Sequence, residues 1–370
     1  MLNIVLSTRL FRLIRVICNY YVLLFIIQMP PVKYFIDMKY ILLLTASIFL
    51  MMISSCRDQT TENEPYIIDL QYFEIRTDLD TNYAYQNTEN INRALQYAKK
   101  KNYRIVEFPK GTYLIASDWD NLPSDDPTSG VPGIIVPSDI TLDLSNATFH
   151  LLPNNHGRYS LFLLYGVKNV TIIGGHLIGD RLNHDYSYDS ERPNTSTHEF
   201  GYGIKIAHSE NIVIKEVKIE QMTGDGVIIG GLGKFNNSRK VVVTKCELFD
   251  CRRQGITIYA GIECELSYNK IYHIKGTPPQ TGIDIEIEEY HTGEYIKIHN
   301  NQISRTEGGA IVCNSGDYID VYENEVKEHV IAVYNSKYVN IYNNTLINTC
   351  IQITHPENVK AYNNRFITQE

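Results

Sequence analysis

Short stretches in which apolar and polar residues alternate recur along the chain from about residue 139 to its end. They begin at Ile140, Val170, Ile212, Lys240, Ile262, Tyr295, Tyr318, Tyr338 and Val359. Such alternation over about four to eight residues is typical of a half-buried β-strand, whereas a helix places apolar residues every three or four positions. The pattern therefore predicts many short strands at a regular interval.

A column of asparagines fixes the register of this recurrence. Its members are Asn269, Asn301, Asn324, Asn344 and Asn364. They are spaced by 32, 23, 20 and 20 residues, and Cys246 occupies the same position one repeat earlier. Asparagine tolerates the left-handed backbone of a tight turn, and its side-chain amide can bond the asparagine of the next repeat. This period, combined with strand-like alternation, predicts a solenoid of strands.

A single helical pattern precedes the strands. Its apolar residues are Ile91, Ala94, Leu95 and Ala98. Residues 88–90 (Thr-Glu-Asn) are suited to begin a helix, and the lysines at 99–101 are suited to end one. The next segment, residues 104–115, contains Val-x-Phe-Pro-x-Gly-x-Tyr. Because an open solenoid end exposes apolar core and unpaired strand edges, the helix is predicted to cap the first coil.

Together these features resemble the right-handed parallel β-helix of the pectate-lyase superfamily. The resemblance covers residues 85–370 and rests on the asparagine column and on the helix followed by Val-x-Phe-Pro-x-Gly-x-Tyr. It implies an all-β fold, a single-stranded right-handed parallel β-helix with an N-terminal capping helix. We expect one such domain over 85–370, preceded by a linker and N-terminal segment over 57–84.

The first 56 residues differ in composition from the rest of the chain. They contain five basic residues, one acidic residue and two apolar runs. The second run follows Met38-Lys39 and ends in Ile53-Ser54-Ser55-Cys56, an order typical of a secretory signal. This ending resembles a bacterial lipobox. The resemblance implies a lipoprotein signal peptide at 38–56, with 1–37 as an extension before the true start.

The same resemblance implies that Cys56 is lipidated and anchors the protein to the outer membrane of a bacterial cell envelope, facing the periplasm or the cell surface. Two alternatives stay open: an ordinary signal peptide with an unrelated cysteine, and a membrane helix near residues 10–28. Without residues 1–56 the formal net charge changes from −8 to about −12. An acidic chain without a basic stripe argues against a nucleic-acid partner, and we expect a monomer.

Insertions point to one face of the predicted solenoid. They fall before the same strand of successive coils, at about 179–201, 222–224 and 275–280. Insertions gathered on one face usually wall a binding groove. Alternation along these strands turns inward Ile204, Val227, Ile256 and Ile283. The residues that alternate with them are expected to face outward in two files. The first file contains Lys205, Thr257 and Asp284, and the second contains Tyr259, Glu286 and Tyr334.

Residues that carry a charge or a titratable hydroxyl on this face are candidates for catalysis. They are Asp225, Arg252, Arg253, Tyr259, Asp284 and Glu286. The arginine forks match a uronate carboxylate, although they can equally pair with aspartates of neighbouring coils. The candidates for substrate binding are Tyr202, Lys205 and Gln254 on the strands and His184, Tyr186 and Tyr188 in the first insertion.

Three acidic residues, Asp284, Glu286 and Glu288, would face outward on one strand. Carboxylates about 6.5–7 Å apart repel one another, so this arrangement suggests a metal ion, a raised pKa or a cationic partner. The alternative is a solvated acidic face. Some β-helix lyases hold calcium with outward acids, and by that resemblance Ca²⁺ is the one cofactor that we expect.

The partner expected for this face is a polysaccharide. Only Asp225 matches the polygalacturonase-type pattern, whereas Thr281-Gly-Ile-Asp284 is similar to the strand of alginate-type epimerases and lyases. The first hypothesis is therefore a polysaccharide lyase or C5-epimerase that acts on a uronate-containing polymer. The alternatives are an inverting glycosidase that uses Asp225 with Asp284 or Glu286, and a non-catalytic glycan-binding protein.

For the first hypothesis, a lyase or epimerase must stabilise an enolate-like carboxylate and remove the C5 proton. Arg252, Arg253 or Ca²⁺ would neutralise the carboxylate. Tyr259 or Lys205 would serve as the base, provided that its pKa is lowered.

Overall fold

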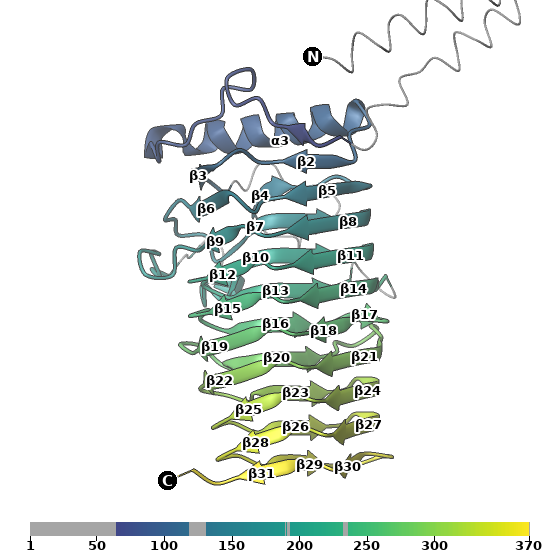
Figure 1. Ribbon diagram of the computed structural model, residues 1–370. Coiled ribbons are helices and arrows are strands. Elements are labelled where there is room, and N and C mark those ends of the chain that lie inside the picture. The colour runs from purple at the N-terminus through teal and green to yellow at the C-terminus, as the bar shows by residue number, and fades with distance from the viewer. Residues whose placement is uncertain (1–63, 118–130, 189, 191–192, 232–235, 370) are drawn as a thin grey trace, which may run out of the picture. The chain divides into compact units, whose positions relative to one another are not determined.

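The computed structural model describes residues 64–117, 131–188, 190, 193–231 and 236–369. Cys56, the predicted signal peptide at 38–56 and the extension at 1–37 lie outside these residues. The described residues belong to one compact unit. In this unit the chain winds into successive coils whose strands stack into three parallel sheets (Figure 1). The predicted right-handed parallel β-helix is confirmed.

Most coils contribute one strand to each sheet. Sheet 1 consists of β1 (Tyr66–Ile67), β2 (Ile105–Glu107), β5 (Ile140–Asp143), β8 (Lys168–Ile173), β11 (Glu210–Lys215), β14 (Ser238–Thr244), β17 (Gly261–Ile262), β18 (Glu265–Ser267), β21 (Gly293–His299), β24 (Asp317–Tyr322), β27 (Lys337–Tyr342) and β30 (Lys360–Tyr362). Sheet 2 consists of β4 (Val131–Ile135), β7 (Arg158–Tyr165), β10 (Phe200–Ala207), β13 (Asp225–Gly230), β16 (Gln254–Ile258), β20 (Thr281–Glu286), β23 (Ile311–Asn314), β26 (Ile331–Tyr334) and β29 (Ile351–Thr354). Sheet 3 consists of β3 (Gly111–Ile115), β6 (Ala147–Leu151), β9 (His176–Ile178), β12 (Lys218–Glu220), β15 (Glu247–Phe249), β19 (Lys270–Ile274), β22 (Gln302–Thr306), β25 (Glu325–Lys327), β28 (Thr345–Ile347) and β31 (Arg365–Ile367).

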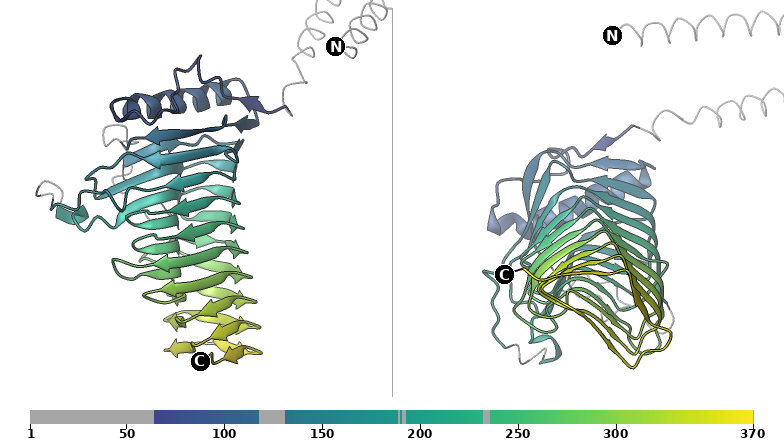
Figure 2. Two further views of the ribbon diagram at one scale, coloured as in Figure 1. Left: turned by 60° about the vertical axis from the view of Figure 1, so that its left-hand side comes forward. Right: turned by 60° about the horizontal axis from the view of Figure 1, so that its bottom comes forward.

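Aligned apolar residues from successive coils form the core. Ile204, Val227, Ile256 and Ile283 pair in register across β10, β13, β16 and β20, and all four are completely buried. The inward file predicted for sheet 2 is therefore confirmed. Because strand side chains alternate, the same register places Lys205 and Asp284 on the outer face of this sheet. The teal segment before β10 projects from the side of the coil (Figure 2).

The asparagine column forms a continuous hydrogen-bonded ladder at the turn between sheets 1 and 3. From Asn269 to Asn364, each side-chain amide donates to the carbonyl oxygen of the next asparagine at 2.9–3.0 Å. The backbone N–H of Cys246 donates to Asn269 Oδ1 at 2.9 Å and so joins the ladder at its upper end. The predicted role of this column is confirmed, because buried amides need such partners.

A 3₁₀ turn, η1 (Thr81–Tyr83), leads into helix α3 (Ala84–Lys100), which covers the N-terminal end of the coil (Figure 1). Its predicted apolar face is buried, as a cap requires. The helix begins at Ala84, before the start expected at 88–90. Thr88 therefore lies inside the helix, where its hydroxyl donates to the Ala84 carbonyl and also bonds the backbone of Ala116. The described helices include none with the length and apolar character needed to cross a bilayer.

Candidate functional site

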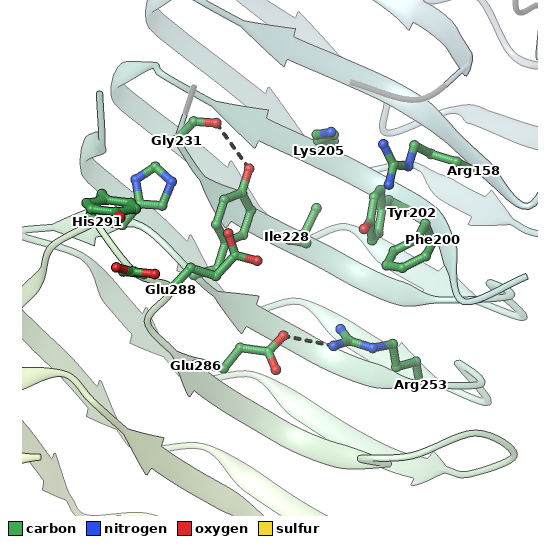
Figure 3. A pocket seen from close by; sticks show the side chains of 13 residues that line it. Arg158, Phe200, Tyr202, Lys205, Ile228, Gly231, Arg253, Glu286, Glu288 and His291 are labelled. Atoms are coloured by element: carbon green, nitrogen blue, oxygen red, sulfur yellow. Dashed lines mark hydrogen bonds and ion pairs between the residues drawn. The ribbon is translucent and has the colours of Figure 1, made fainter. Parts of the chain in front are cut away.

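A pocket of about 360 Å³ lies on the outer face of sheet 2 (Figure 3). Its lining residues are Arg158, Phe200, Tyr202, Lys205, Ile228, Gly231, Arg253, Tyr259, Glu286, Glu288, Glu289, Tyr290 and His291. Strands β7, β10, β13 and β20 supply part of this lining, and the segment after β20 supplies another part. The remaining three, Gly231, Arg253 and Tyr259, stand directly next to the ends of β13 and β16. Six of the residues predicted for the site line the pocket: Tyr202, Lys205, Arg253, Tyr259, Glu286 and Glu288.

One side of the pocket is basic and aromatic. The Arg158 guanidinium lies over the Phe200 ring, 5.0 Å from its centroid, and Lys205 Nζ lies 5.7 Å from the centroid of Tyr202. Such contacts hold a cation over an aromatic face. Glu286, Glu288 and His291 lie across the pocket from these residues (Figure 3). The pocket therefore has a cationic wall facing an acidic one.

Arg253 connects the floor of the pocket to the buried polar groups behind it. Its Nη1 donates to Asp225 at 3.0 Å and to Gln254 Oε1, and its Nη2 donates to Glu286 at 2.9 Å. Burial lowers the pKa of Arg253, but the nearby Asp225 and Glu286 carboxyl groups outweigh this effect and keep it above its ordinary value. The guanidinium therefore stays cationic.

Two carboxyl groups lie behind Arg253 and do not line the pocket. Asp225 is completely buried and Asp284 is 4% exposed. Burial is the largest cause that raises the pKa of Asp225 to about 7 and that of Asp284 to about 8, and the Glu286 carboxylate adds to both. Both groups therefore carry a proton in a substantial part of the molecules at neutral pH.

The hydrogen bonds of Thr257 support a proton on Asp225. The Thr257 hydroxyl contacts Asp225 Oδ2 at 2.9 Å and also Gln254 Oε1. A hydroxyl has one proton to donate, so an ionised carboxylate and an amide oxygen would compete for it. A protonated Asp225 removes the conflict by donating to Thr257, which then donates to Gln254. The Gln254 amide in turn donates to Asp284 at 2.6 Å.

The acidic residues are arranged differently from the predicted file of three. Strand β20 ends at Glu286, so Glu288 lies in the following loop. Asp284 bonds Gln254, and Glu286 pairs with Arg253. Across the described ranges, no group of three or more His, Cys, Asp or Glu side chains is placed to hold a metal ion. The residues as arranged do not fit the expected calcium site.

The first insertion packs largely on its own residues. His184 Nδ1 lies 2.6 Å from Asp180, and His184 Nε2 lies 2.9 Å from His198 Nδ1. The hydroxyl of Tyr159 donates to Asp180 at 2.7 Å and ties this network to β7. Since the His184 side chain is fully buried, a sugar in the pocket would not reach it.

Tyr186, Tyr188 and Arg252 also lie away from the pocket lining. The Arg252 guanidinium lies 4.8 Å from the Tyr186 ring centroid and donates to the backbone carbonyl of His198 at 3.0 Å. Tyr188 is 71% exposed. Neighbouring Arg252 and Arg253 therefore have different surroundings: the first fixes the insertion, and the second faces the pocket.

Sequence reasoning missed several lining residues, and some carry a recognisable signal. Phe200 begins β10 two residues before the expected strand start, and its register partner on β7 is Arg158. His291 follows the acidic run after β20. A Cβ atom on Gly231 would lie 2.7 Å from His291 Cε1, so glycine permits the close approach of this ring.

Comparisons with known proteins agree with the fold. A family model described as "Right handed beta helix region" matches residues 154–326, which include every residue of the pocket lining. YclG of Bacillus subtilis, an uncharacterized protein, is 36% identical over 220 residues, 54% of this chain and 35% of the relative. YorA of Bacillus subtilis, a prophage-derived uncharacterized protein, is 33% identical over 255 residues, 65% of this chain and 43% of the relative. The chain thus spans less than half the length of these relatives.

Solved structures of low sequence identity share the β-helix. The tailspike gp49 of Acinetobacter baumannii bacteriophage Fri1, a capsular polysaccharide depolymerase, aligns with a TM-score of 0.54 at 11% identity, over 83% of this chain and 64% of the tailspike. A tailspike mutant of E. coli bacteriophage HK620 in complex with a pentasaccharide aligns with a TM-score of 0.55 at 12% identity, over 80% of this chain and 54% of the tailspike. The Streptococcus pneumoniae surface protein and adhesin PfbA aligns with a TM-score of 0.52 at 14% identity, over 83% of this chain and 99% of the adhesin. At these identities the likeness shows the pectin lyase-like fold alone.

Proposed function

We propose that this β-helix is a polysaccharide lyase or C5-epimerase that acts on a uronate-containing polymer in the pocket on sheet 2. The observation that carries the proposal is the cationic and aromatic wall of Arg158, Lys205, Arg253 and Tyr202 in a chain of net negative charge. Such a wall matches an anionic sugar, because guanidinium and ammonium groups bind carboxylates and aromatic rings pack on sugar rings.

The first chemical requirement is to neutralise the uronate carboxylate, which takes up charge when the C5 proton leaves. Arg253 is held in place for this by Asp225 and Glu286. When Asp225 carries its proton, one ionised partner of the guanidinium is removed, and more of the positive charge is available to the substrate. Lys205 and Arg158 add to the same field.

The second requirement is a pair of proton-transfer groups. Tyr259, whose hydroxyl donates to the Gly231 carbonyl at 3.1 Å, would accept the C5 proton in its phenolate form. Alternatively Lys205 would accept it as a neutral amine, and Arg158 and Arg253 alone would then supply the positive charge. Burial raises the pKa of Tyr202 well above its ordinary value, so this residue keeps its hydroxyl proton and does not serve as the base. In β-elimination the electrons of the C5–H bond form the C4=C5 double bond, the C4–O4 bond breaks, and Tyr202 would protonate the leaving oxygen. In epimerisation a proton returns to C5 from the opposite face.

The geometry gives less support to an inverting glycosidase with Asp225 as one of its acids. A general acid must come within hydrogen-bond reach of the glycosidic oxygen, and Asp225 is completely buried behind Arg253. Glu286 reaches the pocket, but it is engaged by Arg253. A purely glycan-binding role needs none of these proton-transfer groups.

The test is incubation of the protein with polygalacturonate, alginate and hyaluronan in D₂O. A lyase produces unsaturated ends that absorb in the near ultraviolet, and an epimerase introduces deuterium at C5, seen by NMR. We expect one of these signals, with a loss of about 100-fold or more in Tyr259→Phe or Arg253→Met. Arg252→Met is the matched control, because this neighbouring arginine does not line the pocket.

Three outcomes would reject the proposal. Reducing ends without absorbance or deuterium would indicate a hydrolase. Binding without any change to the polymer would indicate a glycan-binding protein. Equal loss of activity in the Arg252 and Arg253 variants would show that the pocket is not the site.

A lipid anchor at Cys56 and a place in the bacterial outer membrane are also proposed, on the signal-like order of residues 38–56 alone.

A further inference from the structure

Three exposed tyrosines form a stacked ladder on sheet 1, outside the pocket described above. Tyr295, Tyr318 and Tyr338 occupy equivalent positions on β21, β24 and β27, which follow one another along the coil (Figure 1). Their ring centroids are 5.1 Å and 4.8 Å apart, and the ring planes differ by 14° and 2°. The residues are 53%, 44% and 41% exposed, so the ladder is a surface feature.

The backbone at these positions is unfavourable for tyrosine. All three residues have a left-handed φ of 55–57°. The register of sheet 1 places the same left-handed column in the other coils at Asp139, Asn169, Asn211, Lys240, Glu263 and Asn358. Aspartate and asparagine are the residues expected there, whereas a bulky side chain with a positive φ is uncommon. The needs of the turn therefore do not account for three successive tyrosines.

Polar side chains accompany the ladder. A cavity of about 290 Å³ is lined by the three tyrosines together with Ile296, Lys297, Asp320 and Asn340. Asn340 Nδ2 donates to Asp320 Oδ1 at 2.9 Å, which fixes both side chains beside the rings. Lys297 and Asp320 have opposite charges, so this floor offers hydrogen-bond donors and acceptors with little net charge.

A second aromatic row bounds the same face. His299, Tyr322 and Tyr342 stack with centroids 4.7 Å and 5.0 Å apart. Each lies four residues after the corresponding ladder tyrosine, a separation of about 13 Å along the strand. The two rows therefore border a polar strip that runs from coil to coil. We name this face, with Tyr295, Tyr318, Tyr338 and the polar floor, the tyrosine groove.

We infer that the tyrosine groove is a second glycan-binding surface, which holds an extended polysaccharide along the coil axis. A sugar chain repeats C–H faces and hydroxyl groups, and the groove repeats an aromatic ring and a polar group once per coil. A second copy of the protein fits less well, because the strip between the aromatic rows is polar whereas stable interfaces have an apolar, well-packed centre.

The groove follows the pocket directly in the chain. Glu288 and His291 line the pocket, β21 begins at Gly293, and the ladder begins at Tyr295. From there the ladder continues over the next two coils toward the C-terminal end. A polymer longer than the pocket could therefore also bind the groove. The inference takes only the chemical class of polymer from the proposed function, and binding at the groove requires no reaction in the pocket.

The experiment measures affinity for long and short chains separately. Polygalacturonate, alginate and xylan, each as polymer and as a short oligosaccharide, are tested by affinity electrophoresis and calorimetry. We expect Tyr318→Asn to weaken polymer binding about 2–10-fold, and the triple Asn variant of the ladder to weaken it further. Turnover of the short oligosaccharide should not change, because it fits within the pocket.

Asparagine occupies this left-handed column at Asn169, Asn211 and Asn358, so the variants are expected to keep the thermal stability of the original chain. The control is Tyr85→Asn, which changes a tyrosine that is 48% exposed on α3, outside the groove. Unchanged polymer affinity in the triple variant would overturn the inference, as would equal weakening by Tyr85→Asn or failure of every polymer to bind. Ladder-dependent binding without turnover would reject the proposed enzyme and keep the groove.

Discussion

The two buried carboxyl groups behind Arg253 predict an unusual dependence of stability on pH. Burial raises the pKa of Asp225 from 3.8 to about 7 and that of Asp284 from 3.8 to about 8. In the unfolded chain both would titrate near their ordinary values. Between about pH 4 and 8 the folded chain therefore holds more protons on these groups than the unfolded chain does. The free energy of unfolding must then fall as the pH rises through this window.

The expected size of the effect follows from the two pKa values. One pKa unit corresponds to about 1.4 kcal/mol, so the rise at Asp225 alone corresponds to about 4 kcal/mol. Neither carboxyl group is solvated enough for water to screen this cost. Against a typical domain stability of about 5–15 kcal/mol the change is large. In Asp225→Asn or Asp284→Asn, one ionisation is removed, so that variant should lose less stability between pH 5 and 9.

Urea denaturation followed by circular dichroism at pH 5, 7 and 9 measures this directly. Glu289→Gln is the control, because it removes an exposed carboxylate that also lines the pocket. At pH 9 we expect Asp284→Asn to be more stable than the original chain, and at pH 5 the difference should shrink. The reasoning is refuted if the original chain is equally stable at pH 5 and 9, or if Glu289→Gln flattens the curve as much as Asp284→Asn.

Further predictions concern the asparagine ladder, the pocket charge and the anchor. Asn301→Ala should lower the free energy of unfolding by about 3 kcal/mol or more, because it leaves several buried hydrogen-bonding groups without a partner. Asn364→Ala, at the half-buried end of the ladder, should lower it by about 1 kcal/mol, and urea denaturation would measure both values. Uronate binding should weaken from pH 6 to 9 as Asp225 and Asp284 ionise near Arg253, and it should weaken less in Asp225→Asn, in which only Asp284 still ionises, as calorimetry would show. Cys56→Ser should release the protein from bacterial membranes, and fractionation showing equal retention would contradict lipidation.

The coil was predictable because its main requirements are local. An asparagine such as Asn301 needs only its equivalents one coil away, and these stand at similar intervals in the sequence. The helix start was predicted less well, because Thr88 is a good capping residue by composition. Its hydroxyl instead contacts Ala116, 28 residues later. A hydrogen-bond partner so far away in the sequence cannot be predicted from the pattern of neighbouring residues.

The candidate site was predictable where strands form it and less so where loops do. Alternation and register found Lys205 and Asp284 on one outer file. The same reasoning extended the strand through Glu288, because a sequence of alternating acids and isoleucines does not show where pairing stops. For His184 the loop composition suggested contact with sugar, but the ring is buried against Asp180. Whether a loop packs on itself depends on contacts that no local pattern encodes.

Formal charge gives a misleading picture of the pocket. Residues 57–370 carry about −12 by counting side chains, which argues against a polyanionic substrate. Counting assigns a full negative charge to Asp225 and Asp284, yet burial raises their pKa values to about 7 and about 8. A side chain that alternation places on the outer face of a strand, such as Asp284, is here covered by Gln254 and its neighbours. Because this burial keeps a proton on the two carboxyl groups in a substantial part of the molecules at neutral pH, a locally cationic wall can exist in an acidic protein.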